Sequence, residues 1–296
     1  MRLVTCNYQQ KHYLGISKGD DVVLPALSAK VPPHFNNMLA LIEGGAAALA
    51  ELRQWLDEHP DHRQIPKDQI RLLAPIPRPR KNIMALGWNY ADHVEESAQA
   101  FKRDLKLPEH PVVFTKSVTT VNGPYDDFPY DKHLSTQIDW EVELGVIIGR
   151  GDRGIPIKEA LDHVFGYTVI NDISARDLQS RHRQFFMGKS LDGSCPMGPW
   201  IVTRDEIPNP QELDLCSRVN GELKQQSNTR HQIFDVATTL SILSQGMTLE
   251  PGDIIATGTP SGVGFARTPP EFLHPDDVVE CEVQGIGTIR NRIVAV

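Results

Sequence analysis

The sequence predicts a β-rich α+β chain, with a small N-terminal α/β domain over residues 1–75 and a larger domain over residues 76–296. Two observations support this prediction. A proline-rich stretch, residues 75–80, has the composition of a stiff linker between two parts. Beyond it, short apolar runs alternate with glycine and proline, of which the chain has 22 each. This pattern favours many short strands whose loops carry the chemistry. The runs are residues 82–87, 111–116, 140–148, 165–170, 200–202, 253–257 and 278–283.

The N-terminal part is expected to contain strands followed by one helix. Residues 1–30 are typical of short strands, with a turn at residues 19–21. A helix is predicted over residues 37–58, where Asn36 or Asn37 could cap the start and Pro60 ends it. Its apolar residues recur near the 3.6-residue period of a helix. They are Met38, Leu41, Ile42, Leu49, Leu52, Trp55 and Leu56.

The composition argues against several classes of protein. Lys plus Arg is 30 and Asp plus Glu is 38, so the formal net charge is −8. Because clustered cations drive phosphate binding, neither a nucleic acid nor an anionic membrane is an expected partner. No apolar run approaches the ~18 residues that span a bilayer, and the N-terminus turns polar too early for a signal peptide. The four cysteines form no C-x-x-C pair, so no disulfide framework or thiolate zinc site is indicated, and we expect a cytoplasmic protein.

The strongest local signal is a row of acids on an apolar strand, residues 139–148. Side chains on a strand alternate between faces, so residues 140, 142, 144 and 146 share one face and Asp139, Glu141 and Glu143 share the other. A hard divalent cation bound by carboxylate oxygens would relieve the repulsion between these acids. Asp172, at the end of a later apolar run, could complete a site with Glu141 and Glu143. The alternatives are a strand face in water and an Asp172 that only serves a turn.

A second candidate is the pair His93 and Glu96. If the segment after Gly87 is helical, these residues lie three apart on one face. A carboxylate orients an imidazole and raises its basicity, which gives a general base able to activate water. The alternative is a surface helix with scattered charges. The spacing is not that of a zinc-protease helix.

Two glycine-containing loops supply further candidates. Lys189 follows Gly188 and could stabilise an anion above the acids, although a solvated lysine is the alternative. A phosphate-binding loop is excluded there, because its first glycine would fall on Arg183. Residues 251–264 are typical of a strand with a glycine-rich turn. Backbone N–H groups and threonine hydroxyls in that turn could hold a carboxylate, and the alternative is a turn that simply needs glycine.

In combination, these motifs give a resemblance that none of them gives alone. From about residue 70 to the end, the sequence resembles the fumarylacetoacetate hydrolase family, and within it the branch of fumarylacetoacetate hydrolase domain-containing protein 2. The resemblance implies a mixed β-sandwich roll, a homodimer and a divalent cation, Mg²⁺ or Mn²⁺ with Ca²⁺ possible. It is carried by residues 87–93, 114–117, 139–144, 171–177, 188–193 and 257–260.

The resemblance also implies roles for individual residues. Glu141, Glu143 and Asp172 would be the metal ligands. His93 and Glu96 would activate water from a lid that orders over the substrate. Lys189 would contact the oxo or carboxylate oxygens of the substrate, and Thr259, next to Gly258, would contact a carboxylate. Arg176 would have a supporting role, and Trp88 would narrow the pocket. Residues 181–184 either set the substrate preference or form a solvated charged loop.

The function implied by the resemblance is metal-dependent chemistry on a small 2-oxo acid. Its carboxylate and oxo group chelate the cation, which stabilises an enolate. Our first expectation is hydrolysis of a carbon–carbon bond in an acylpyruvate-type 2,4-dioxo acid through a metal-bound enolate. The alternatives on the same site are an oxaloacetate-type decarboxylase and a 2-hydroxy-dienoate isomerase or hydratase. A protein that binds metal and oxo acid without turnover is a further alternative.

Overall fold

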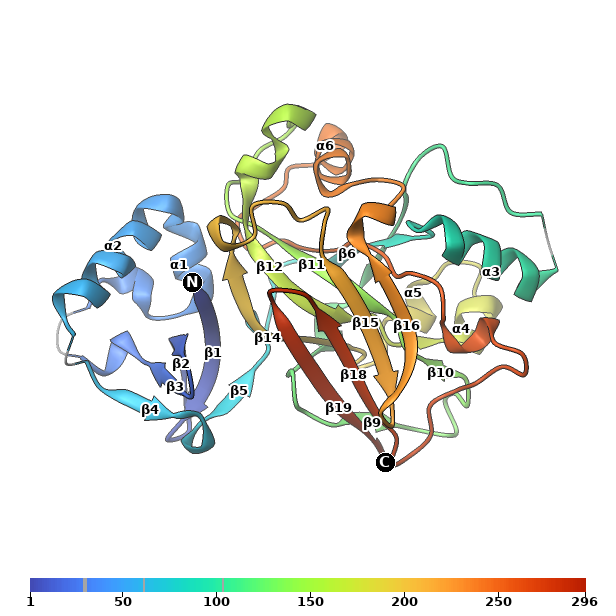
Figure 1. Cartoon of the computed structure of the whole chain (residues 1–296), viewed down its shortest axis with the longest axis horizontal. Coiled ribbons are helices and arrows are strands. Elements are labelled where there is room, and N and C mark those ends of the chain that lie inside the picture. The colour runs from blue at the N-terminus through green and yellow to red at the C-terminus, as the bar shows by residue number, and fades with distance from the viewer. Residues whose placement is uncertain (29–30, 61, 103) are drawn as a thin grey trace.

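The computed structural model describes residues 1–28, 31–60, 62–102 and 104–296. Figure 1 shows the N-terminal strands and helices as a lobe beside a larger β-rich body. The expected strands and the turn after residue 18 are present. The strands of the lobe are β1 (Arg2–Tyr8), β2 (Lys11–Lys18), β3 (Asp21–Val23), β4 (Gln64–Pro66) and β5 (Arg71–Leu73).

The predicted helix over residues 37–58 is present but is divided into two. Helix α1 (Met38–Glu43) begins after Asn37, whose side chain accepts a hydrogen bond from the Ala40 N–H at 2.9 Å. Helix α2 (Gly45–Glu58) follows after a break. Gly45 has a φ of +61°, a left-handed conformation that glycine adopts without steric cost. The apolar period runs on through the break, so the sequence pattern did not reveal it.

The largest sheet runs through both parts of the chain. Strand β1 pairs antiparallel with β14, and Arg2 lies opposite Val202. The strand order is β4-β3-β2-β1-β14-β12-β11-β17-β6-β7. The domain boundary between residues 75 and 76 stays a prediction, and the largest sheet contains strands from both sides of it. The strands beyond the lobe in this order are β6 (Ile83–Gly87), β7 (Val112–Lys116), β11 (Val142–Ile148), β12 (Val164–Asn171), β14 (Cys195–Thr203) and β17 (Ile254–Ala256).

A second sheet packs against the first and encloses the main core. Its order is β16-β15-β18-β19-β9. Side chains of β11 and β12, such as Leu144 and Val169, pack in one buried cluster with Cys281 and Ile289 of the second sheet. The strands of this sheet are β9 (Phe128–Tyr130), β15 (Asp214–Val219), β16 (Glu222–Asn228), β18 (Val278–Val283) and β19 (Gly287–Ala295). Besides β5, which pairs with β1, the strands outside these two orders in the described residues are β8 (Val121–Asn122), which pairs with β14, and β10 (Ile138–Asp139) and β13 (Ser174–Ala175), which pair with each other.

The predicted alternation along residues 139–148 is confirmed on the apolar face, where Trp140, Val142, Leu144 and Val146 are all in the main core. The alternative of a strand face in water is wrong. Glu141 and Glu143 are 4% and 0% exposed. Strand β11 is covered on both faces, because the opposite face packs on a second core that includes residues of the N-terminal lobe. The acids are therefore held inside the protein.

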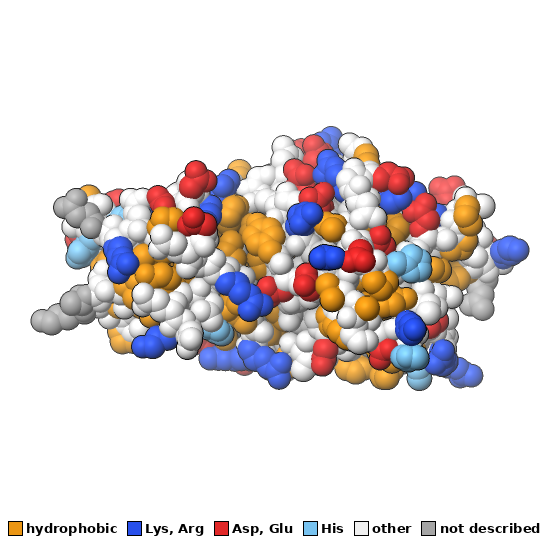
Figure 2. Space-filling view, turned by 90° about the horizontal axis from the view of Figure 1, so that it is seen from below, with side chains coloured by type: hydrophobic (Ala, Val, Ile, Leu, Met, Phe, Trp, Pro, Cys, Tyr) orange, Lys and Arg blue, Asp and Glu red, His pale blue; other side chains and the backbone are white. Residues whose placement is uncertain are grey.

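Helices and loops surround the sheets. Figure 2 shows one face of the molecule, on which acidic and basic side chains are interspersed. Within the described residues, no helix is both long and apolar enough to span a bilayer. The homodimer and the cytoplasmic location stay predictions. The remaining helices are α3 (Ala91–Phe101), α4 (Arg176–Arg181), α5 (Phe186–Lys189) and α6 (Val236–Gly246).

Candidate active site

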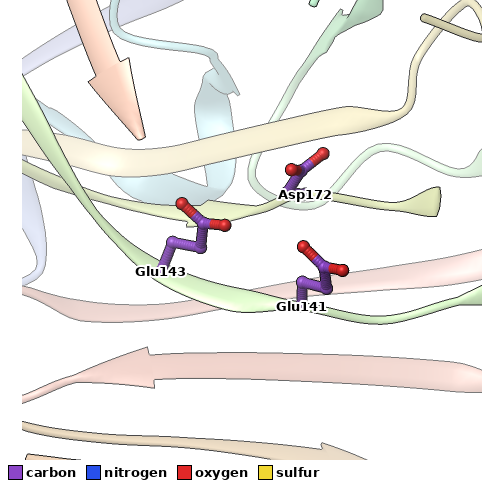
Figure 3. A group of neighbouring side chains, drawn as sticks. All are labelled: Glu141, Glu143 and Asp172. Atoms are coloured by element: carbon purple, nitrogen blue, oxygen red, sulfur yellow. The ribbon is translucent and has the colours of Figure 1, made fainter. Parts of the chain in front are cut away.

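Antiparallel pairing of β11 with β12 brings the three predicted acids together. Val142 lies opposite Asn171 in this pair, so Glu141 precedes one strand where Asp172 follows the other. The Asp172 N–H donates to the Glu141 carbonyl oxygen at 2.8 Å. One carboxylate oxygen from each of Glu141, Glu143 and Asp172 lies within 4.8 Å of the others, and all three residues are buried (Figure 3). This is a group of oxygen donors that could hold a hard divalent cation.

Three buried cations surround these acids. The Lys189 Nζ atom donates to Glu141 Oε2 at 2.6 Å and to Asp172 Oδ2 at 2.7 Å. The Lys116 Nζ atom lies 2.6 Å from Asp172 Oδ1. Arg176 Nη2 lies 2.7 Å from Glu141 Oε1. Each contact is a charge-assisted pairing in a dry environment, where such pairings fix geometry strongly.

Arg176 has the supporting position that the resemblance implied. Its Nε donates to Asp139 Oδ2 at 2.8 Å, while its guanidinium carbon lies 4.5 Å from the centre of the Phe265 ring. Asp139 Oδ1 also accepts the Gly264 N–H at 2.7 Å. Asp139 is therefore occupied by the arginine and by the backbone, although the strand pattern placed it on the same face as Glu141 and Glu143.

Lys116 is a site residue that the sequence reasoning missed. It is 0% exposed and, besides contacting Asp172, donates to the Ile173 carbonyl at 3.1 Å and to Ser194 Oγ at 3.3 Å. A signal was present in the sequence, because Lys116 ends an apolar strand within one of the resemblance motifs. A lysine is almost never fully buried without a partner.

Glu143 supplies the observation that fits a metal ion. The Gly258 N–H donates to its Oε2 at 2.7 Å, whereas its buried Oε1 has no hydrogen-bond partner in the described part of the chain. Burial first, and then the charges of Asp172 and Glu141, raise the pKa of Glu143 well above its usual value. A divalent cation would satisfy the free oxygen and compensate the like charges.

Glu141 differs from Glu143 in the direction of its pKa shift. Burial acts to raise its pKa, but Lys189 and Arg176 outweigh that effect and lower the pKa to about 2. The pKa values of these two neighbouring glutamates are therefore shifted in opposite directions.

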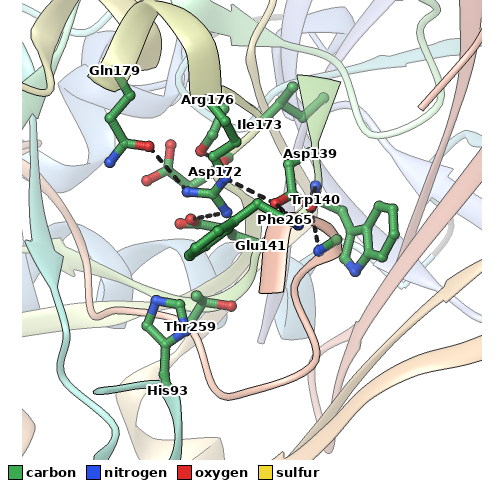
Figure 4. Close-up of polar contacts among 12 residues, drawn as sticks. His93, Asp139, Trp140, Glu141, Asp172, Ile173, Arg176, Gln179, Thr259 and Phe265 are labelled. Carbon is green, nitrogen blue, oxygen red and sulfur yellow. Dashed lines mark hydrogen bonds and ion pairs between the residues drawn. The ribbon is translucent and has the colours of Figure 1, made fainter. Parts of the chain in front are cut away.

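His93 and Glu96 form the pair that their spacing predicted. Both lie on α3, and His93 Nδ1 is 2.7 Å from Glu96 Oε1. The other oxygen, Glu96 Oε2, accepts the Gly262 N–H at 2.8 Å. The carboxylate thus fixes the ring through Nδ1 and leaves Nε2 for other partners. Figure 4 shows His93 and Thr259 on one side of this region, with Glu141 and Arg176 on another.

The start of α3 is fixed by the residues just before it. Trp88 has a φ of +53°, which turns the chain sharply between β6 and the helix. Asn89 then anchors the turn, because its side-chain amide donates to the Thr257 carbonyl at 2.8 Å and to the Phe234 carbonyl at 3.0 Å. His93 is positioned by this anchored turn.

A cavity of about 550 Å³ joins the parts of the site. His93, Glu141, Lys189 and Thr259 all line it. Much of the remaining wall is aromatic: Trp88, Phe101, Phe114, Phe185 and Phe265. The cavity therefore has a charged inner surface within an apolar wall, as expected of a site for a small polar substrate.

Other predicted residues lie behind the cavity surface. Glu96 orients His93, and Asp172 pairs with Lys189 and Lys116. Glu96, Asp172 and Glu143 do not line the cavity. The Gly258 N–H donates its hydrogen bond to Glu143 Oε2. The Thr259 hydroxyl donates to the Val142 carbonyl at 2.9 Å and accepts from Gln225 at 2.7 Å. Substrate contacts by Gly258 and Thr259 remain predictions.

Comparison with known proteins places this fold and site in context. A family model described as "Fumarylacetoacetate (FAA) hydrolase C-terminal" matches residues 82–294. Oxaloacetate tautomerase YisK of Bacillus subtilis is 40% identical, over 99% of this chain and 100% of that protein. The mitochondrial oxaloacetate tautomerase FAHD2B of Bos taurus is 39% identical, over 99% and 92% respectively.

A solved structure adds a bound metal to the comparison. Maleylpyruvate hydrolase from Sphingobium sp. SYK-6, in complex with manganese(II) and pyruvate, aligns with a TM-score of 0.78 and 30% identity over 100% of this chain and 99% of that chain. These similarities confirm the resemblance found from the motifs and the fold that it implied.

Proposed function

We propose that this chain, which belongs to the fumarylacetoacetate hydrolase family, interconverts the keto and enol forms of a 2-oxo dicarboxylic acid of the oxaloacetate type. The family and the buried Glu/Glu/Asp group make it an enzyme with an acidic metal site. The full-length similarity to two oxaloacetate tautomerases supports tautomerisation. It favours the alternatives, which named an oxaloacetate-type substrate for a decarboxylase and an isomerase or hydratase for a 2-hydroxy-dienoate, over our first expectation, carbon–carbon bond hydrolysis.

The observation that carries the proposal is a base and a cation at the same cavity. His93, with Glu96 on its Nδ1, and Lys189, paired with Glu141 and Asp172, both line it. Keto–enol exchange needs a base that removes a proton beside the carbonyl and a cation that stabilises charge on the carbonyl oxygen. No water needs to be added and no carbon–carbon bond needs to break.

In the proposed step, His93 Nε2 takes a proton from C3 of the keto acid while the C3–H electrons form the C2–C3 double bond. The 2-oxo oxygen gains the charge, which the Lys189 ammonium stabilises. A proton from solvent on that oxygen completes the enol, and His93 returns its proton to solvent. Glu96 stabilises the imidazolium that forms. The reverse sequence regenerates the keto form, so atoms and charge balance.

Glu141, Glu143 and Asp172 are the proposed ligands of Mg²⁺ or Mn²⁺. When bound, the cation supplies Lewis-acid stabilisation of charge on the substrate oxygens. The likeness to a manganese- and pyruvate-bound hydrolase supports this ion and a small oxo acid as partner. The free Glu143 Oε1 supports the same assignment.

Hydrolysis of an acylpyruvate is the second candidate, and the His93–Glu96 pair is the observation that favours it. The same base could deprotonate water for attack on a C4 carbonyl. A structural relative is named a maleylpyruvate hydrolase. Tautomerisation and hydrolysis therefore require the same base and differ in their products.

The test is to add the purified chain with Mg²⁺ or Mn²⁺ to enol-oxaloacetate and to an acylpyruvate, and to follow loss of enol absorbance. Chromatography of the products then identifies the reaction. Faster ketonisation without new carbon fragments supports the tautomerase, whereas release of pyruvate and a carboxylic acid from the acylpyruvate supports the hydrolase.

His93→Ala should lower the catalysed rate at least 100-fold, in the range attributed to general acid–base catalysis. Glu95→Gln is a matched control, because Glu95 is the exposed neighbour on the same helix. An unchanged rate in His93→Ala would remove the base from the proposal.

A further inference from the structure

One face of α4 and the turn that follows it forms a polar strip along the cavity. Arg176, Gln179, Ser180 and Arg183 all line the cavity. Gln179, Ser180 and Arg183 follow Arg176 by three, four and seven residues, which is the spacing of a single helical face. The strip begins at the inner end, where Arg176 contacts Glu141, and continues beyond the last helical residue to Arg183. A ligand lying along the strip would meet polar groups over its whole length.

The two inner cations of the cavity are already paired. Arg176 donates to Asp139 and to Gln179 and is paired with Glu141. Lys189 is shared between Glu141 and Asp172. Arg183, by contrast, has neither a hydrogen bond from its side chain nor an ion pair within residues 1–28, 31–60, 62–102 and 104–296. Its charge is available to a ligand.

Arg183 is also placed at a useful distance from the inner end. Helix α4 ends at Arg181, and its five steps from Arg176 rise about 7.5 Å, so Arg183, two residues further on, lies at the outer end of the strip. Arg183 is exposed and has a φ of +55°, so the chain turns here at the cavity mouth. Trp88 and Phe185, whose rings meet edge-on with centres 6.0 Å apart, also line the cavity. The Trp88 and Phe185 rings carry no charge that would compete with Arg183 for a carboxylate.

We propose that Arg183 binds the second carboxylate of a 2-oxo dicarboxylic acid and thereby selects diacids over monoacids. This inference rests on the proposed function for the position of the 2-oxo end, which would lie at Glu141 and Lys189. A guanidinium presents a planar fork of N–H donors that matches a carboxylate. The inner end, at Glu141 and Lys189, would meet the group common to all 2-oxo acids, whereas Arg183 is the cation of the strip that has no carboxylate partner among the described residues and would meet the far end.

The test is a binding experiment that needs no turnover. Calorimetry with Mg²⁺ present compares 2-oxoglutarate with 2-oxopentanoate, which has the same carbon chain without the second carboxylate. The native chain is expected to bind the diacid about tenfold more tightly, about 1.4 kcal/mol. In Arg183→Gln the ratio of the two affinities falls to about one, and Arg183→Lys retains part of it.

Arg181→Gln is the matched control. Arg181 is exposed on the same segment but does not line the cavity, so this variant keeps the native ratio. A native ratio of one, or a ratio that Arg183→Gln leaves at its native value, overturns the proposal, because the arginine is then only solvated. An equal loss in Arg181→Gln also overturns it, since general surface charge then explains the preference.

Failure of the proposed function would look different. A chain that shows the Arg183-dependent preference but does not accelerate proton exchange at C3 binds diacids without tautomerising them. A chain that accelerates exchange equally on diacids and monoacids retains the proposed chemistry and loses the role of Arg183.

Discussion

Glu141 and Asp172 hold each other in place through both backbone and side chain. The Asp172 N–H donates to the Glu141 carbonyl oxygen at 2.8 Å, and a single Lys189 ammonium bridges the two carboxylates. Two residues far apart in the sequence are thereby fixed by strand pairing before any ligand arrives. Glu143 completes the group with an oxygen that none of the described residues satisfies. The three carboxylates are therefore positioned before a ligand binds, although their like charges lie close together.

Glu143→Gln should separate metal binding from folding. Because burial and the charges of Asp172 and Glu141 raise the pKa of Glu143, its ionised form is disfavoured in the folded protein, and a neutral amide at this position should stabilise the metal-free protein at neutral pH. Mn²⁺ affinity should fall at least 100-fold. Urea unfolding in chelator and calorimetry with Mn²⁺ measure the two effects. Glu95→Gln, the exposed control, should change neither quantity, and native Mn²⁺ affinity in Glu143→Gln would reject Glu143 as a ligand.

Lys116→Met should be one of the most damaging single changes in the site. Asp172 would lose a fully buried partner at 2.6 Å, and breaking a buried ion pair from one side costs about 3–5 kcal/mol. Urea unfolding in chelator measures this loss, and saturating Mn²⁺ should recover part of it by compensating Asp172. Lys158→Met, at an exposed lysine, is the control. A cost below about 1 kcal/mol would mean that Lys116 does not compensate Asp172.

The sequence predicted the acids because strand alternation is a local property. The period of two placed Glu141 and Glu143 on one face, and the next apolar run supplied the returning strand with Asp172. The three-residue spacing of His93 and Glu96 was likewise enough, since one turn of α3 brings them together. The motifs beyond residue 70 also predicted the family, which its model and full-length relatives confirm.

Other features depend on tertiary register, so their contacts could not be predicted from a local pattern. The pairing of β1 with β14 joins residues about 200 positions apart and extends the sheet into the N-terminal lobe. Lys116 and Arg176 reach the acids only after several strands have assembled. The break before Gly45 is invisible in the apolar period, because both helices present their apolar residues to the same core.

Phe101→Ala should loosen α3 over the cavity. The Phe101 ring stacks on Phe265 with centres 5.2 Å apart and planes at 24°, and such a pair contributes about 0.5–1.5 kcal/mol beyond its burial. Amide exchange over residues 91–101 should accelerate about tenfold, and KM should rise more than kcat falls. Gln99→Ala, at an exposed position of the same helix, is the control. Unchanged amide exchange would show that the helix is held without the stack, by the hydrogen bonds that Asp92 accepts from the Ser261 hydroxyl and Glu96 accepts from the Gly262 N–H.

Alkaline pH should destabilise the fold through its buried thiols. Burial raises the pKa of Cys6 and Cys195 to about 12 and that of Cys281 well above its usual value, whereas a free thiol has a pKa of about 8.5. Above that pH the unfolded chain releases thiol protons that the folded chain retains. Stability is therefore fully present below about pH 8.5 and is lost as the pH rises, by about 1 kcal/mol per thiol between pH 9 and 10.

Urea unfolding at pH 8, 9 and 10 measures this loss, and Cys6→Ala isolates one thiol from the lysines and tyrosines that also titrate. The variant should lose about 1 kcal/mol less than the native chain between pH 9 and 10. Labelling at pH 8 should modify the half-buried Cys216 well before the three buried thiols. Equal alkaline losses in Cys6→Ala and in the native chain would mean that the Cys6 thiol ionises as readily in the folded protein as in the unfolded one, contrary to its burial between the strands of the N-terminal lobe.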